Sequence, residues 1–350
     1  MSVYRLKEEL LKLTRPYFSR ADQVQGPGGN TSVKDDEGRM IIKASGFRFD
    51  EVTDVQGFSI VDNEKIRKYF YDVEVQDKEK EEKASVDLIL SNILKDENGQ
   101  QYLKPSMETG FHSVLGKYVV HTHSVWSNLF NCVSQYDVLV DKLRKQLEIR
   151  IAVIPYVSPG FGLSYLITKM AKDAIANGEE IPSVIFLLNH GILAHSGNES
   201  GVIELLEKVD SGIRNILDIK EAFPETGILE QSPKCYVPLN GYVAETIRKI
   251  GVDERFFTKV LFPDQTVFFK GNIAIDASDS DKKIQVKTNG EISYHTNYRE
   301  AKSMHETMTA YLFIFDQVRR LSLKPVFIPE KELDYINAMD MEKHRKSFME

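Results

Sequence analysis

Cysteine, tryptophan and long apolar runs are scarce in this sequence of 350 residues. Its cysteines, Cys132 and Cys235, are too few for a disulfide framework, so we expect a reducing compartment. No apolar run approaches the roughly 20 residues of a membrane span. The N-terminus alternates charge with leucine and lacks the apolar centre of a signal peptide. These absences predict a cytoplasmic protein without a membrane partner.

A surplus of positive charge is absent as well. The chain has 45 Lys and Arg against 52 Asp and Glu, a net charge of −7, which argues against a broad nucleic-acid surface. Hydrophobic residues make up 42% and charged residues 28% of the sequence, as is typical of a globular protein. The length suffices for one large domain or two ordinary ones.

Strand and helix patterns alternate through the first two-thirds of the sequence. Clusters of β-branched and apolar residues predict strands at 40–45, 57–62, 118–123, 150–157 and 183–196. Amphipathic patterns predict helices at 4–18, 85–95, 125–133, 161–178 and 198–223. We expect the strand 183–196 to be interrupted by Gly191, and a further helix to open near Pro105 with Ser106 as its cap. This alternation predicts an α/β core.

The texture of the sequence changes near residue 226. Prolines punctuate a less regular stretch, and Asn289-Gly290 predicts a hairpin turn. Two helical patterns follow, at 298–320 and 330–348. We therefore expect a first domain over 1–225 and a smaller α+β extension over 226–350.

Histidines concentrate in the middle of the chain. His121 and His123 follow a buried strand, and residues two apart on a strand point to the same side. Such a pair can grip a metal, act together in catalysis, or simply pack. His190, at the end of another apolar strand and beside a glycine, offers the third imidazole of a catalytic zinc site, with His195 as a competitor.

Polar residues in three other segments can complete a site. Glu108 lies one helical turn before His112, and either interacts with a helix dipole or serves as a general base beside a metal. The turn "GPGGNTS" exposes backbone N–H groups that can bind an anion, although it lacks the ending of a P-loop. The segment "ASG" at 44–46 and Ser106 offer further donors. As isolated features, the turn "GPGGNTS", the segment "ASG" and Ser106 are explained more simply as ordinary turns.

Six blocks, in order, resemble the class II aldolase/adducin family of sugar-phosphate aldolases, which includes fuculose-1-phosphate and rhamnulose-1-phosphate aldolases. The resemblance spans roughly residues 5–221. The blocks are "GGNTSVK", "IIKASG", "PSMETGFH", "VVHTHSVW", "IPYVSPG" and "LLNHGILAHSGN".

The resemblance implies a three-layer α/β/α sandwich around a largely antiparallel sheet, in a homo-oligomer such as a tetramer. It also implies metal-dependent cleavage or formation of a carbon–carbon bond in a sugar phosphate through an enediolate. Zinc is the implied cofactor, although three imidazoles also accept Mn²⁺, Fe²⁺ or Co²⁺. Carried over by position, Glu108 is the catalytic acid/base. The implied metal ligands are His121, His123 and His190, and the implied phosphate contacts are Asn30, Ser45, Gly46 and Ser106.

Departures from the family pattern leave alternatives open. Met107 stands where sugar-phosphate aldolases often have a second serine, which puts the usual phosphate geometry in question. The tyrosine that a neighbouring subunit supplies in typical members has no clear counterpart, with Tyr136 and Tyr156 as candidates. Epimerases, decarboxylases and dehydratases share the metal chemistry, but related epimerases carry aspartate in place of Glu108. Adducin, a structural protein, lacks the histidines that this chain retains.

Overall fold

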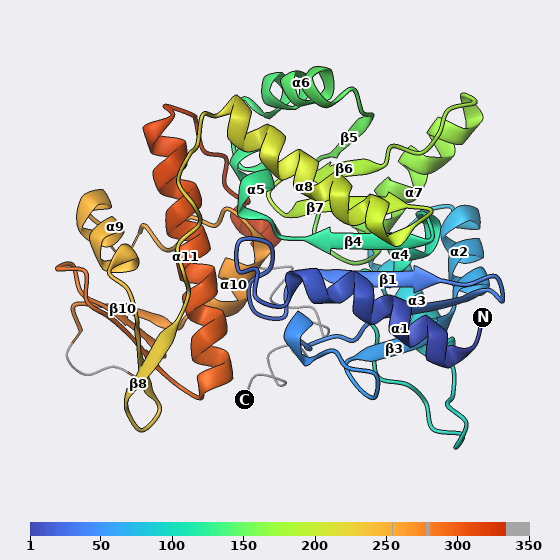
Figure 1. Ribbon diagram of the computed structural model, residues 1–350, viewed down its shortest axis with the longest axis horizontal. Helices are drawn as coiled ribbons and strands as arrows, with labels where there is room; N and C mark the ends of the chain where they lie inside the picture. The colour runs from blue at the N-terminus through green and yellow to red at the C-terminus, as the bar shows by residue number, and fades with distance from the viewer. Residues whose placement is uncertain (254, 278–280, 334–350) are drawn as a thin grey trace.

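The computed structural model describes residues 1–253, 255–277 and 281–333, and its larger sheet has seven strands in the order β3-β2-β1-β4-β7-β6-β5 (Figure 1). All neighbouring pairs are antiparallel except β5 with β6. The strands are β1 Asn30–Lys34, β2 Arg39–Lys43, β3 Phe58–Asp62, β4 Tyr118–Thr122, β5 Ile151–Ile154, β6 Val184–Leu187 and β7 Gly191–Ser196. The protein is therefore of the mixed α/β class, as the alternating patterns predict.

Helices bury apolar side chains against both faces of this sheet. Consecutive strand residues point to opposite faces, so Val119 and Val120 of β4 enter two separate apolar clusters. Helices α1, α5, α6 and α8 contribute to the cluster around Val120, and α2, α3, α4 and α7 to the one around Val119. Their bounds are α1 Val3–Thr14, α2 Asn63–Asp72, α3 Lys78–Ser91, α4 Thr109–Val114, α5 Val125–Asn131, α6 Tyr136–Leu147, α7 Phe161–Ala176 and α8 Glu199–Ile216.

A five-stranded sheet with the order β10-β11-β12-β9-β8 follows in the chain. Its strands are β8 Ile228–Ser232, β9 Cys235–Pro238, β10 Ile273–Ile275, β11 Ile284–Val286 and β12 Ile292–His295. The helices are α9 Tyr242–Ile250, α10 Pro263–Phe269 and α11 Tyr298–Arg320. Strands β11 and β12 pair antiparallel around Asn289-Gly290, so the predicted hairpin is confirmed. The predicted helix at 298–320 is also confirmed, whereas that at 330–348 lies outside the described residues from 334 onward.

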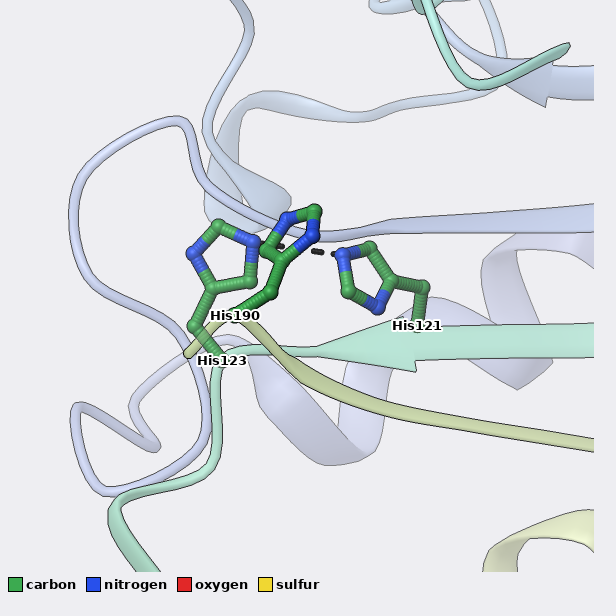
Figure 2. A group of neighbouring side chains, drawn as sticks. All are labelled: His121, His123 and His190. Carbon is green, nitrogen blue, oxygen red and sulfur yellow. Dashed lines mark hydrogen bonds between the residues drawn. The ribbon is translucent and has the colours of Figure 1, made fainter. Parts of the chain in front are cut away.

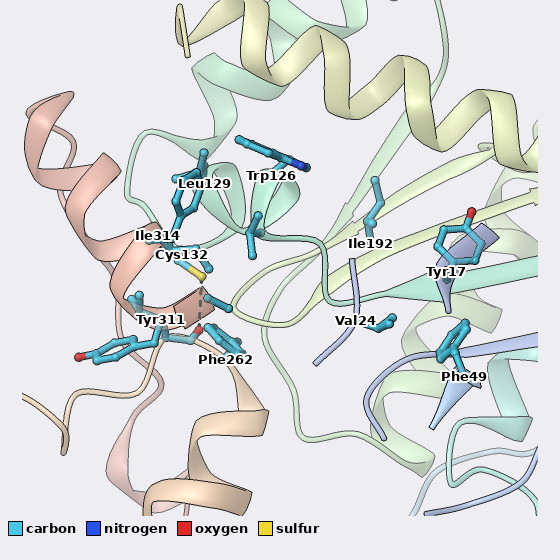
Figure 3. Packing of buried hydrophobic residues seen from close by; sticks show 14 of the residues in the cluster. Tyr17, Val24, Phe49, Trp126, Leu129, Cys132, Ile192, Phe262, Tyr311 and Ile314 are labelled. Atoms are coloured by element: carbon cyan, nitrogen blue, oxygen red, sulfur yellow. Dashed lines mark hydrogen bonds between the residues drawn. The ribbon is translucent and has the colours of Figure 1, made fainter. Parts of the chain in front are cut away.

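Helix α11 lies between the two sheets and joins them through one buried cluster (Figures 1 and 3). Figure 3 shows Leu129 and Cys132 from the first part of the chain beside Phe262, Tyr311 and Ile314 from the second. The Cys132 thiol also donates a hydrogen bond to the Leu261 carbonyl, at 3.4 Å. The boundary at 225/226 stays a prediction, but apolar packing crosses it without interruption.

Two local expectations need correction. The segment 183–196 is not one interrupted strand but the antiparallel hairpin β6–β7, with Asn189 in the left-handed region (φ 53°) at its turn. A Cβ at Gly191 would lie 2.3 Å from the Thr122 carbonyl oxygen, so glycine lets this hairpin approach β4. Helix α4 begins at Thr109 rather than near Pro105, because the Ser106 hydroxyl accepts a hydrogen bond from the Glu108 N–H and holds a turn there.

Other differences concern helices. Helix α6 (Tyr136–Leu147) has no counterpart among the predicted elements, and α3 begins at Lys78, well before the helix predicted at 85–95. Over residues 1–253, 255–277 and 281–333, the helices are all too short or too polar to cross a bilayer.

Candidate metal centre

Three histidines converge where two neighbouring strands meet (Figure 2). His121 is on β4, His123 follows the end of that strand, and His190 lies in the turn that leads into β7. Because β4 and β7 pair directly, with Thr122 opposite Ile192, this turn lies beside the end of β4. All three rings are buried, and one ring nitrogen from each lies within 4.8 Å of the other two.

Hydrogen bonds fix the proton positions on two of these rings. The Nδ1 atom of His121 contacts the Ile192 carbonyl at 3.0 Å, and Nδ1 of His123 contacts the Asp264 carboxylate. Both partners only accept hydrogen bonds, so both Nδ1 atoms carry a proton, and Nε2 is the ring nitrogen left to bind another partner. Burial lowers the pKa of His121, with an opposing effect from Glu108, which favours the neutral ring that metal binding requires.

The spacing of these lone pairs fits a divalent cation. The Nε2 atoms of His121 and His123 lie 3.2 Å apart, and two lone pairs at that distance repel unless a proton or cation lies between them. Tetrahedral zinc with Zn–N bonds of about 2.0–2.1 Å places its nitrogen ligands about 3.3 Å apart. The donor set therefore fits the zinc ion that the resemblance implies, and His190 offers a third nitrogen.

Glu108 lies beside this cluster, as the sequence predicts. Its carboxylate oxygens are 3.6 Å from Nε2 of His121 and 3.5 Å from Nε2 of His190. The Asn30 amide donates to Oε2 at 2.6 Å, and Glu108 is 5% exposed, so solvent screens its charge little. A buried carboxylate held by one donor and facing a cation site can both ligate and exchange protons.

A buried hydrogen-bond chain stands behind Glu108. The amide nitrogen of Asn30 also contacts the Ser106 hydroxyl at 3.1 Å, so its oxygen faces Nε2 of His112. That oxygen only accepts, so His112 carries its proton on Nε2, and its Nδ1 accepts from the Ser32 hydroxyl at 2.7 Å. Burial lowers the pKa of His112, so the ring is neutral. His112 is therefore not among the converging ligands, but it fixes the orientation of Asn30.

The four residues predicted to contact phosphate line one pocket with Glu108, His123 and His190. An isolated bridge between Ala44 and Pro105 brings the two serine-containing segments together. Sequence reasoning missed Lys43 in "IIKASG", which also lines this pocket. Its ammonium group donates to the Pro27 and Phe47 carbonyls at 3.2 and 2.6 Å. The predicted phosphate residues are Asn30, Ser45, Gly46 and Ser106.

The remaining candidates lie elsewhere. His195 donates from Nε2 to the Pro182 carbonyl at 3.1 Å, and burial lowers its pKa to about 4. Neither Tyr136 nor Tyr156 is among the residues that line the pocket. Sequence reasoning also missed Asp264, which no local pattern connects with residues 141 positions earlier.

The sequence of residues 8–210 matches the model of the class II aldolase and adducin N-terminal domain. This match covers more than half of the chain. The chain belongs to the class II aldolase and adducin family. The family resemblance drawn from the six sequence blocks is confirmed, and the matched region contains His121, His123, His190 and Glu108.

Solved structures of class II aldolase proteins are similar to this chain. The N-terminal class II aldolase domain of a conserved protein from Thermoplasma acidophilum is 23% identical, with a TM-score of 0.47 over 60% of this chain and 92% of that one. YgbL from Klebsiella pneumoniae, described as a candidate aldolase, epimerase or decarboxylase, is 19% identical, with a TM-score of 0.45 over 63% and 92%. An L-fuculose 1-phosphate aldolase is 20% identical, with a TM-score of 0.41 over 66% and 93%. No curated protein matches the chain.

Proposed function

We propose that this protein is a metal-dependent aldolase that cleaves or forms a carbon–carbon bond in a sugar phosphate. The observation that carries the proposal is the convergence of three imidazole nitrogens within 4.8 Å of one another. The Glu108 carboxylate oxygens lie 3.6 Å from Nε2 of His121 and 3.5 Å from Nε2 of His190. A purely structural protein has no need for four buried titratable side chains whose lone pairs face one another.

The chemistry divides between the cation and the chain. A divalent cation held by His121, His123 and His190 supplies a Lewis acid for negative charge that develops on the substrate. Glu108, buried at the wall of this pocket, takes the proton from the reacting carbon or returns it. Asn30 holds the carboxylate oxygen through its 2.6 Å hydrogen bond and thereby aims it.

The pocket also contains groups that suit the anionic end of a phosphorylated substrate. Lys43 supplies positive charge, Ser45 and Ser106 supply hydroxyl groups, and Gly46 supplies backbone without a side chain in the same pocket. A phosphate bound by these groups would place the adjacent carbons toward the histidines, which supports a phosphorylated substrate. Asn30 already donates to Glu108 and Ser106, so its part is to position both residues.

Further parts of the proposal rest on the family. We propose zinc as the ion, with Mn²⁺, Fe²⁺ or Co²⁺ as alternatives, a three-layer α/β/α sandwich as the catalytic domain, and a homo-oligomer such as a tetramer. Epimerisation, decarboxylation and dehydration are the alternative reactions, because the same proton transfer beside a cation serves each of them.

A retro-aldol screen tests the activity. The zinc-loaded protein is incubated with phosphorylated and unphosphorylated ketoses, and released dihydroxyacetone phosphate or aldehyde is measured. We expect cleavage of a phosphorylated ketose, and loss of both bound metal and activity in His121→Ala. Product with an inverted centre, or released carbon dioxide, identifies an alternative reaction instead. A protein that holds well under one equivalent of metal after zinc addition refutes the proposal.

A further inference from the structure

The ring of His123 is held by a residue from outside the family domain. Asp264 lies in the first turn of α10, more than 50 positions beyond the matched residues 8–210. Its carboxylate accepts the hydrogen bond from Nδ1 of His123 and is fully buried. The part of the chain after residue 225 therefore reaches the metal centre directly.

We propose that Asp264 is a positioning residue for His123, so that the C-terminal part of this chain completes the metal centre. The proposal rests on the proposed metal site. A carboxylate on Nδ1 fixes the tautomer, orients the ring and increases the electron density at Nε2. Each of these effects favours a cation bound at Nε2, the atom of His123 that faces His121.

Local structure places Asp264 accurately. Pro263 opens α10, where its fixed φ suits the first helical position. The side-chain oxygen of Gln265 accepts hydrogen bonds from the N–H groups of Leu261 and Phe262, at 2.7 and 3.3 Å. These bonds hold the turn that leads into α10. Phe262 is fully buried in the shared apolar cluster, so Asp264 stands on a rigid base.

The segment that precedes α10 also supports the turn that contains His190, the next candidate ligand. The Leu261 carbonyl accepts a hydrogen bond from the side-chain amide of Asn189 at 2.9 Å, and the Val326 carbonyl accepts another at 2.8 Å. Asn189 directly precedes His190 in the β6–β7 turn. The C-terminal part of the chain thus contacts His123 directly and contacts Asn189, the residue that precedes His190.

The backbone of the glycine-rich loop packs closely against His123 and Asp264. A Cβ at Gly28 would lie 2.9 Å from Nδ1 of His123 and 3.1 Å from Oδ1 of Asp264. The loop backbone therefore lies directly against the contact, and any side chain there would push the two partners apart. This close approach gives Gly28 in "GPGGNTS" a specific role.

Helix α11 holds the loops on either side of the pocket. Glu306 accepts from the Gly26 N–H at 2.8 Å and from both terminal nitrogens of Arg48, at 2.9 and 2.8 Å. Arg299 donates to the Gly46 carbonyl at 2.7 Å and to Glu51. Residues of α11 therefore hold the two loops that contribute residues to the pocket wall.

Metal affinity tests the role of Asp264 separately from activity. The full chain is stripped with a chelator, and Zn²⁺ and Co²⁺ are titrated in competition with a chromophoric chelator. We expect Asp264→Ala to weaken metal binding by about 10- to 100-fold and to alter the visible spectrum of bound Co²⁺. Asp264→Asn keeps an oxygen that accepts from Nδ1, so it should restore part of the affinity.

The matched control is Asp316→Asn, which removes a carboxylate from α11 that pairs with Lys249 at 2.6 Å, in a contact that includes no metal-site residue. We expect wild-type metal affinity in this variant. If Asp264→Ala fails to fold by circular dichroism, Gly28→Ala serves as the second perturbation, with the same expected loss. Wild-type affinity and Co²⁺ spectrum in folded Asp264 variants overturn this inference alone. A wild-type protein that binds neither ion overturns this inference and the proposed function together.

Discussion

Replacing Glu108 with glutamine separates proton transfer from metal binding in one substitution. Asn30 donates to Oε2 at 2.6 Å, so the glutamine side chain should turn its carbonyl oxygen toward Asn30. Its amide NH₂ group then occupies the place of Oε1, 3.5 Å from Nε2 of His190. An amide there cannot take a proton from carbon, whereas the three imidazoles are unchanged.

The expected loss follows from the size of general acid–base catalysis. Removing a positioned base typically costs a factor of about 10² to 10⁴, which corresponds to roughly 3–5 kcal/mol in the activation barrier. We expect Glu108→Gln to keep close to one equivalent of metal and to lose activity by such a factor. Glu108→Asp keeps the charge but draws it back by one methylene, so we expect an intermediate loss.

Deuterium exchange measures the step itself. Dihydroxyacetone phosphate is incubated with the metal-loaded enzyme in D₂O, and loss of its carbon-bound proton signal is followed by NMR, with metal content measured on the same samples. Wild-type exchange by fully loaded Glu108→Gln would show that another group moves the proton. Loss of metal in parallel with exchange would instead assign Glu108 to metal binding.

Other predictions address the surroundings of the site. His112→Phe leaves the Asn30 oxygen and the Ser32 hydroxyl without their partner, so urea unfolding should show a stability loss of about 3 kcal/mol, and activity should fall. Unchanged stability would contradict the two buried hydrogen bonds of His112. His195 has its pKa lowered to about 4, so its unfolded form takes up a proton first as pH falls below about 6.5. Folding stability should therefore drop by about 2 kcal/mol between pH 7.5 and 5, and less in His195→Gln; equal losses would exclude His195 as a source. Cys132 is fully buried and burial raises its pKa, whereas Cys235 is half-buried, so a thiol reagent should modify one cysteine in the folded protein and two in denaturant. Rapid reaction of both would contradict the packing around Cys132.

Strand periodicity made the histidine pair predictable. His121 and His123 are two residues apart at the end of a buried strand, and this spacing alone brings their rings together. His190 was placed correctly near the pair although its segment was taken as one strand, because both a strand end and a hairpin turn bring it to the same edge of the sheet. Asparagine is among the residue types that tolerate the left-handed region, but this tolerance alone did not place a hairpin turn at Asn189.

Long-range contacts were out of reach for sequence reasoning. The contact of Asp264 with His123 joins positions 141 residues apart, and no period or motif relates them. The role of His112 was missed for a different reason. A buried neutral imidazole can orient an amide, and only the position of Asn30 reveals that contact. Lys43 was within reach, because it stands two residues before Ser45 in a segment already singled out.

The buried cluster that contains Leu129, Cys132, Phe262 and Tyr311 couples the unfolding of the two sheets. Side chains that share one packed interior cannot separate without exposing apolar surface on both sides, so the two parts should melt in a single cooperative transition. Below that transition, a local fluctuation around α10 would withdraw Asp264 from His123 and the Leu261 carbonyl from Asn189 while the seven-stranded sheet stays folded. In the Co²⁺-loaded protein, a change in the visible spectrum should therefore report local damage in a region that contains none of the candidate ligands.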